Sequence, residues 1–155
     1  MKTIPCEDTT AFEQLQIRVA QSLLSLRLGV FLVMLMWTLD KFINPAHSAK
    51  VFEGFYAMGG MGHGLLMALG ILELLLLLLF LGGIWRRFSY GTVLLLHAIS
   101  TFASFGKYLD PFNNLLFFAA WPMLAACITL YLLRNWDTLG VVGRRAPAET
   151  GRVAQ

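Results

Sequence analysis

Three ionisable side chains stand inside long apolar runs, where a group able to carry charge is expensive. Arg27 lies in one run, Glu73 in the next and His97 in a third. A charge at the centre of a bilayer costs from roughly 3 to more than 10 kcal/mol, so such residues usually pair with one another or mark a functional site. A histidine and a carboxylate in an apolar cleft can exchange protons, and a neighbouring arginine keeps the carboxylate ionised. The pattern predicts a polar pocket at the middle of a membrane.

A polar stripe extends this predicted pocket along the third run. Its members recur at steps of three and four residues, so they share one face of a helix; they are His97, Ser100, Thr101, Ser104 and Tyr108. Quinone carbonyls accept hydrogen bonds and take up protons on reduction, so we expect a quinone to fit here. The predicted quinone-binding residues are Arg27, Glu73, His97 and Thr101, and the predicted proton relay consists of Glu73 and His97.

Other interpretations of the same residues stay open at this point. Arg27 and Glu73 can form a buried ion pair that only fixes the register of two helices, with His97 a hydrogen-bonded interior side chain. The three can also meet another subunit. Asp40 and Lys41, which close the first run, can pair with each other or anchor its end at the membrane surface.

A second group of candidate ligands lies in the longest gap between apolar runs. Met58, Met61 and His63 form an MxxMxH pattern in a glycine-rich loop, with His47 and Met67 nearby. Thioethers and imidazoles suit Cu(I), so this loop is a candidate copper site. The alternative is that the methionines only make the loop adaptable.

The composition sets these residues in a membrane protein. The chain has 155 residues, 57% hydrophobic and 14% charged, whereas ordinary soluble domains have about 25% charged residues. This composition excludes a disordered chain, a disulfide-rich secreted module and a protein that binds nucleic acid. The two cysteines, Cys6 and Cys127, are far apart, and one interior histidine cannot ligate a haem from both sides, so we expect no iron–sulfur cluster or haem in this chain.

Four segments are long enough to cross a bilayer core, which needs about 20 apolar residues in a helix. The predicted fold class is therefore all-α, an integral membrane four-helix bundle, with spans at about 20–43, 65–84, 88–108 and 114–134 in a transmembrane domain of residues 20–134. Residues 1–19 are predicted to be a cytoplasmic amphipathic helix, and 48–56 a short interfacial helix in the first outer loop. Residues 135–155 are predicted to be a cytoplasmic polar tail that frays. No internal repeat is found.

The basic residues predict the orientation of these spans. Most of them fall on one side, at Lys2, Arg18, Arg86, Arg87, Arg134, Arg144, Arg145 and Arg152. The other side has Lys41, Lys50 and Lys107. Because cytoplasmic loops carry the excess of Lys and Arg, we expect both termini in the cytoplasm.

Residues 20–134 contain five short motifs: Arg27-Leu28-Gly29, Trp37-Thr38-Leu39-Asp40-Lys41-Phe42, Gly70-Ile71-Leu72-Glu73-Leu74, Leu81-Gly82-Gly83 and the turn Arg86-Arg87. With these motifs the chain resembles the DoxX-like family of small four-helix bacterial membrane proteins. The resemblance implies a location in the bacterial inner membrane and makes Arg27, Lys41 and Glu73 the shared polar positions. Members of that family are associated with quinone-linked redox chemistry and with operons for oxidative stress or metal handling.

The chain carries no redox-cofactor motif of its own, which shapes the predicted function. We expect a DoxX-like membrane subunit of a redox complex that binds quinone or relays protons at mid-membrane, beside a separate electron-donating protein. It would be at most a quinone-linked oxidoreductase subunit. The alternatives are a non-catalytic accessory subunit that anchors or stabilises a larger membrane assembly, and a copper-handling membrane protein. Expected partners are membrane lipids and other protein subunits or further copies of the chain, and no nucleic acid.

Overall fold

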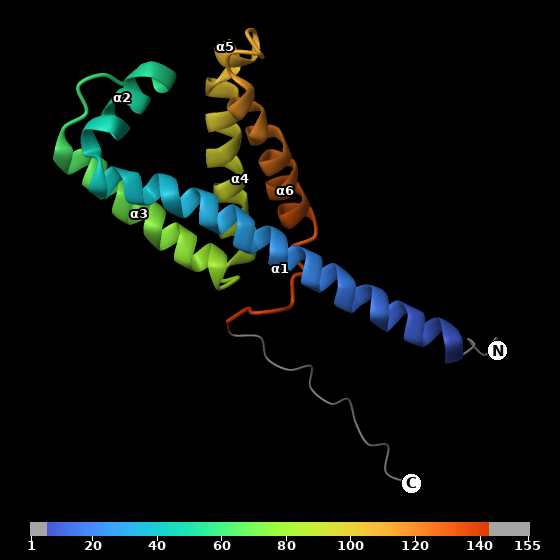
Figure 1. The fold of residues 1–155 in the computed structure, drawn as a ribbon. Coiled ribbons are helices and arrows are strands. Elements are labelled where there is room, and N and C mark those ends of the chain that lie inside the picture. Colours follow the sequence, from blue (N-terminus) through green and yellow to red (C-terminus); the bar gives the residue numbers. More distant parts are fainter. Residues whose placement is uncertain (1–5, 143–155) are drawn as a thin grey trace.

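The computed structural model describes residues 6–142, and side chains from residue 10 onward. All regular structure in this range is helical, which confirms the all-α fold class (Figure 1). The elements are α1 (Cys6–Ile43), α2 (Pro45–Tyr56), α3 (His63–Leu81), α4 (Arg86–Ala103), α5 (Phe105–Tyr108), the 3₁₀ helix η1 (Leu115–Ala119) and α6 (Ala120–Leu132).

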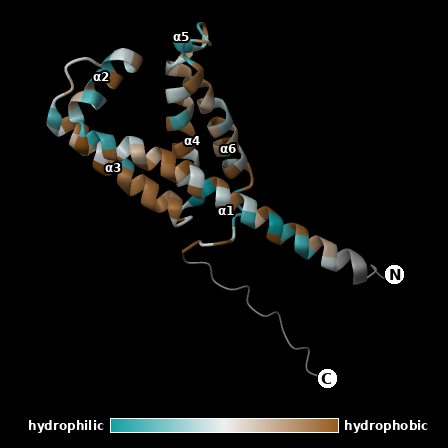
Figure 2. Cartoon of the chain, viewed as in Figure 1, coloured by the Kyte–Doolittle hydropathy of each residue, from teal (hydrophilic) through white to brown (hydrophobic). Residues whose placement is uncertain are grey.

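Three stretches of helix in the described range are long and apolar enough to cross a membrane. They are Thr10–Ile43 in α1, His63–Leu81 in α3 and Leu115–Leu132 in η1 and α6. Figure 2 shows α3 as the most uniformly apolar of them, which its leucine run explains. The fourth predicted span is also a helix, α4, but two arginines and the polar stripe lower its hydropathy. Three of the four predicted spans therefore meet this standard.

The helices form two antiparallel pairs. α1 packs along α3 and α4 packs along α6, and the two pairs meet near the middle of α1 (Figure 1). The core lies where all four helices meet, and consists of Leu23, Val30, Met34, Leu76, Leu77, Phe80, Tyr90, Val93, Cys127 and Leu130. Each of the four helices thus buries one apolar side in a common core.

Local sequence explains where the short helix α2, between α1 and α3, begins and ends. Pro45 occupies its first turn, where the missing N–H costs no hydrogen bond, so the helix begins three residues before the predicted position 48. It ends where predicted, because Ala57 adopts a left-handed conformation that stops the helix. The ring centroids of Phe55 and Phe117 lie 5.7 Å apart, which ties α2 to η1.

The chain after α6 folds back onto the helices as far as the structure describes it. Residues 136–142, here called the C-terminal strap, run from the end of α6 to a position below α1 (Figure 1). The backbone N–H of Val142 donates to the carbonyl of Gly82 at the end of α3, with N···O 2.8 Å. The tail was expected to fray from residue 135 onward, and this first part of it is instead packed. Residues 143–155 lie outside the described range.

Candidate functional site

The side chain of Arg27 is completely buried, in a group formed by α1, α4 and the C-terminal strap. Its Nη1 lies 3.2 Å from Oδ2 of Asp137 and donates to the hydroxyl of Tyr90, also at 3.2 Å. Its Nη2 donates to the carbonyls of Leu139 and Gly140. The guanidinium therefore bonds to the strap through both terminal nitrogens, and its charge is balanced by a carboxylate beyond the last helix.

Asp137 completes this group, which we call the arginine cluster (Arg27, Tyr90 and Asp137). The Tyr90 hydroxyl donates to the same Oδ2 that faces Arg27. Two buried atoms in the cluster, Nε of Arg27 and Oδ1 of Asp137, have no hydrogen-bond partner among the described residues. From α4, Arg86 donates to the carbonyls of Arg134 and Asp137, both at 2.7 Å, and so holds the start of the strap in place.

Glycine makes room for the strap at the turn between α3 and α4. Gly83 has φ +61°, a conformation that residues with a Cβ adopt only with strain. A Cβ there would lie 2.5 Å from Cγ1 of Val141 and 2.9 Å from Nη1 of Arg27. The Leu81-Gly82-Gly83 motif therefore has a structural role, because it lets the strap and the guanidinium approach the backbone.

Glu73 belongs to a different group, near the other end of α1. Its Oε2 lies 2.7 Å from Nζ of Lys41, and the two side chains are only 15% and 11% exposed. The antiparallel register of α1 and α3 explains this pairing. Phe42 packs against Gly70, where a Cβ would lie 2.7 Å from the ring, while Arg27 lies beside Gly83. Glu73 precedes Gly83 by ten residues, about 15 Å along a helix, so the expected pair of Arg27 with Glu73 is not formed.

Asp40 and Lys41 do not pair with each other, which was one of the expectations for them. Asp40 accepts hydrogen bonds from Nδ1 of His47 at 2.7 Å and from the hydroxyl of Ser48 at 2.8 Å. Asp40 therefore holds α2 against the end of α1, while Lys41 holds α3. The imidazole of His47 stacks on the indole of Trp37, which adds to this corner.

His97 is buried in a third group, between α4 and α6. Its Nε2 lies 3.0 Å from the carbonyl oxygen of Ala120 and 3.4 Å from Oγ1 of Thr101. The hydroxyl of Tyr108 donates to the carbonyl of Thr101, so part of the predicted polar stripe does lie together. Of the four predicted quinone ligands, the structure brings together only His97 and Thr101. Arg27 and Glu73 lie in separate groups because each has a closer partner of opposite charge.

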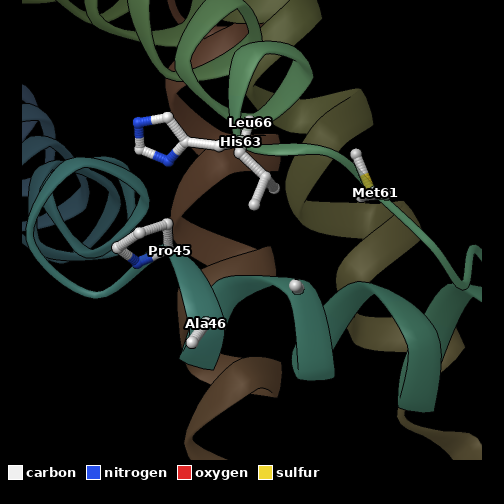
Figure 3. Close-up of a pocket in the computed structure, with 6 residues that line it drawn as sticks. Pro45, Ala46, Met61, His63 and Leu66 are labelled. Carbon is white, nitrogen blue, oxygen red and sulfur yellow. The ribbon is translucent and has the colours of Figure 1, made fainter.

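Two of the three predicted copper ligands, Met61 and His63, line a shallow hollow between α2 and the start of α3. The hollow has a volume of about 240 Å³ and is lined by Pro45, Ala46, Ala49, Met61, His63 and Leu66. Figure 3 shows the imidazole of His63 and the thioether of Met61 on different sides of it. Met58 is 48% exposed and is not part of the lining. Within residues 10–142, no group of three or more His, Cys, Asp or Glu side chains is placed to hold a metal ion.

Asp137 and Tyr90 are the site residues that sequence reasoning missed. Neither was among the predicted site residues, and Asp137 was placed in the tail that was expected to fray. One signal was available, because a buried arginine needs a carboxylate and Asp137 follows the last span directly. No protein-family model, no curated protein and no solved structure matches the chain.

Proposed function

We propose that the chain is a DoxX-like membrane subunit of a redox assembly, and that it supplies a rigid helical platform for a partner protein that donates the electrons. The observation that carries this proposal is the pairing of the intramembrane charges within the chain. Arg27 forms an ion pair with Asp137 and a hydrogen bond with Tyr90, and Lys41 forms an ion pair with Glu73. Polar groups that satisfy one another fix helix register and are poorly placed to exchange protons with a ligand.

The position of the two ion pairs supports a platform role. The pair of Lys41 with Glu73 joins α1 to α3, and the arginine cluster joins α1 to α4 and to the strap after α6. Large apolar side chains remain exposed on the outer faces of the bundle, as lipid or a partner's helices require; on α3 they include Ile71, Leu72, Leu75 and Leu78. A helical bundle that is held together by internal ion pairs and has an apolar surface suits an anchor for a larger assembly.

A double variant separates the platform from a proton relay. Glu73→Gln alone leaves Lys41 buried without a counter-charge and is expected to destabilise the chain by about 3–5 kcal/mol. Lys41→Met combined with Glu73→Gln removes both charges and is expected to restore thermal stability, assembly size and the quinone-reducing activity of membranes that contain the complex. Replacing a buried ion pair by neutral groups of similar volume is often close to neutral.

The native assembly gives the readout for this test. The tagged full chain would be solubilised from its own host in a mild detergent, and the assembly sized by native electrophoresis. The proposal predicts an assembly larger than the 17.3 kDa chain in its detergent micelle, with a cofactor-bearing protein in fixed ratio. Loss of redox activity in the double variant with normal assembly size would show that Glu73 relays protons, and the platform role would then be rejected.

A second candidate function is a quinone contact at His97. It is favoured by one observation, the proximity of His97 to Thr101 on the polar stripe of α4. An imidazole N–H and a threonine hydroxyl are both able to donate to a quinone carbonyl. This role places a head group between α4 and α6, and leaves Glu73 out of the contact.

Matched threonine variants test this candidate. Thr101 and Thr129 each donate a hydrogen bond to the carbonyl four residues earlier, but Thr101 is buried beside His97, whereas Thr129 is half-buried on α6. If quinone binds here, His97→Ala and Thr101→Ala will each lower the quinone extracted per purified chain several-fold, and Thr129→Ala will not. Equal quinone content in all three variants would exclude this contact.

A further inference from the structure

Arginine and lysine are segregated to opposite ends of the molecule. In residues 10–142 one end carries all of the arginines, Arg18, Arg27, Arg86, Arg87 and Arg134, with the carboxylates Glu13 and Asp137. The other end carries all of the lysines, Lys41, Lys50 and Lys107, with Asp40, Glu53, Glu73 and Asp110. The described part of the chain is therefore positive at one end and slightly negative at the other.

Contacts between distant segments show that the first set does share one end, here called the arginine end. Arg86 at the start of α4 donates to the carbonyl of Arg134 at the end of α6. The rings of Phe12 and Trp136 meet edge to face at 6.5 Å, which places the start of α1 at the same end. The arginine end therefore combines the N-terminal half of α1, the turn between α3 and α4, and the C-terminal strap.

Two arginines at this end have side chains without a hydrogen-bond or ion-pair partner among the described residues. Arg27 and Arg86 bond to the strap, and Arg134 donates to the carbonyl of Tyr131 and lies over its ring. Arg18 and Arg87 are exposed, and their side chains have no hydrogen bond or ion pair among the described residues. Their charges are available to a ligand outside the chain.

Exposed aromatic side chains flank Arg87. Trp85 is 73% exposed and Phe88 is 60% exposed, on either side of Arg87 in the turn that leads into α4. Tryptophan and arginine side by side at the end of an apolar helix are typical of the boundary between acyl chains and headgroups. Arginine also binds phosphate through two parallel hydrogen bonds, which lysine cannot do.

From this placement we propose that the arginine end binds anionic phospholipids, with Arg18 and Arg87 contacting headgroup phosphates and Trp85 and Phe88 lying among the upper parts of the acyl chains. Charge complementarity selects an anionic occupant for the arginine end. In the described part of the chain this end carries more arginines than carboxylates, whereas the lysine end carries more carboxylates than lysines. The proposal does not depend on the redox role, since it concerns the purified chain and a lipid alone.

The test compares charge removal at the two ends. The full chain, purified in a neutral detergent, would be titrated with phosphatidylglycerol or with zwitterionic phosphatidylcholine, and the retained lipid counted by native mass spectrometry. Each arginine near an anionic surface contributes about fivefold in binding. Arg18→Gln combined with Arg87→Gln is therefore expected to lower the preference for phosphatidylglycerol by about 25-fold. The matched control, Lys50→Gln combined with Lys107→Gln, removes two exposed charges from the other end and is expected to leave the preference unchanged.

The outcomes decide the proposal in either direction. All four side chains are exposed and make no hydrogen bond or ion pair with the described part of the chain, so the variants are expected to keep the thermal stability of the parent chain. An unchanged preference in the arginine variant would overturn the proposal, and so would an equal loss in the lysine variant. Inorganic phosphate gives a separate arm: if it displaced phosphatidylglycerol at equal concentration, the site would recognise free phosphate and the lipid assignment would be wrong.

Discussion

At the scale of single residues, the arginine cluster depends on one carboxylate. Arg27 is fully buried, and among the described residues Asp137 is its only partner of opposite charge. Asp137→Asn removes that charge and is expected to cost about 3–5 kcal/mol, because an uncompensated guanidinium stays buried. The loss would be measured as a lower thermal midpoint of the purified chain in detergent.

Asp110 provides the control for this prediction. Its carboxylate is exposed and accepts hydrogen bonds from the nearby side chain of Asn113. Asp110→Asn should therefore change stability by less than about 0.5 kcal/mol. Equal midpoints for the two aspartate variants would contradict the buried ion pair.

Sequence analysis identified the polar residues within the apolar runs, but it did not predict which residues they contact. Arg27, Glu73 and His97 were recognised because charge or polarity in an apolar run is rare. Their partners depend on helix register and on the path of the chain after α6, and neither follows from hydropathy. Lys41 was available as a partner of Glu73, but it was expected to pair with Asp40 or to anchor the end of its helix at the membrane surface, while Glu73 was expected at the middle of the membrane.

At the scale of elements, the turn between α3 and α4 decides whether the strap can dock. Gly83 combines a positive φ with close contacts to Val141 and Arg27. We expect Gly83→Ala to destabilise the chain by at least about 1–2 kcal/mol from backbone strain alone, with more from the displaced strap. Thermal unfolding of the purified variant measures the first effect, and faster proteolysis after residue 135 measures the second.

Gly29 is the matched position for that substitution. It lies within α1, where a Cβ would meet nothing within 4 Å. Gly29→Ala is expected to be neutral or to stabilise the helix by about 0.5–1 kcal/mol, because alanine loses less backbone entropy than glycine. A similar loss of stability in both variants would mean that the Gly83 turn has no special role.

Secondary structure in these elements was more predictable than their contacts. Hydropathy located α3, α4 and α6 to within several residues and the end of α1 at Ile43, and the 48–56 pattern located α2. The start of α1 was missed, because the segment before residue 20 continues into the first span as one helix from Cys6. The 3₁₀ stretch η1 was not expected. Pro122 lies in the first turn of α6, which a proline tolerates because its missing N–H has no partner there anyway.

At the scale of the whole molecule, the contacts constrain how many helices cross the membrane. The start of α1 and the strap after α6 lie at the same end, since Phe12 meets Trp136 and Arg27 bonds to Leu139. A chain that enters and leaves at one end crosses an even number of times. α1, α3 and α6 alone give an odd number, so we predict that α4 is a fourth crossing despite its polar stripe.

Cysteine labelling tests this arrangement directly. Cys6 would be replaced by serine, and Cys127 is buried and stays unlabelled. Single cysteines at Glu13 and Val142 mark the arginine end, and one at Lys50 marks the lysine end. With four crossings and the arginine end in the cytoplasm, as the basic residues predict, an impermeant maleimide added to intact cells will label Lys50→Cys, while Glu13→Cys and Val142→Cys will react only after the membrane is opened. If Glu13→Cys and Val142→Cys reacted from opposite sides, the chain would cross an odd number of times, and α4 would have to lie outside the bilayer core.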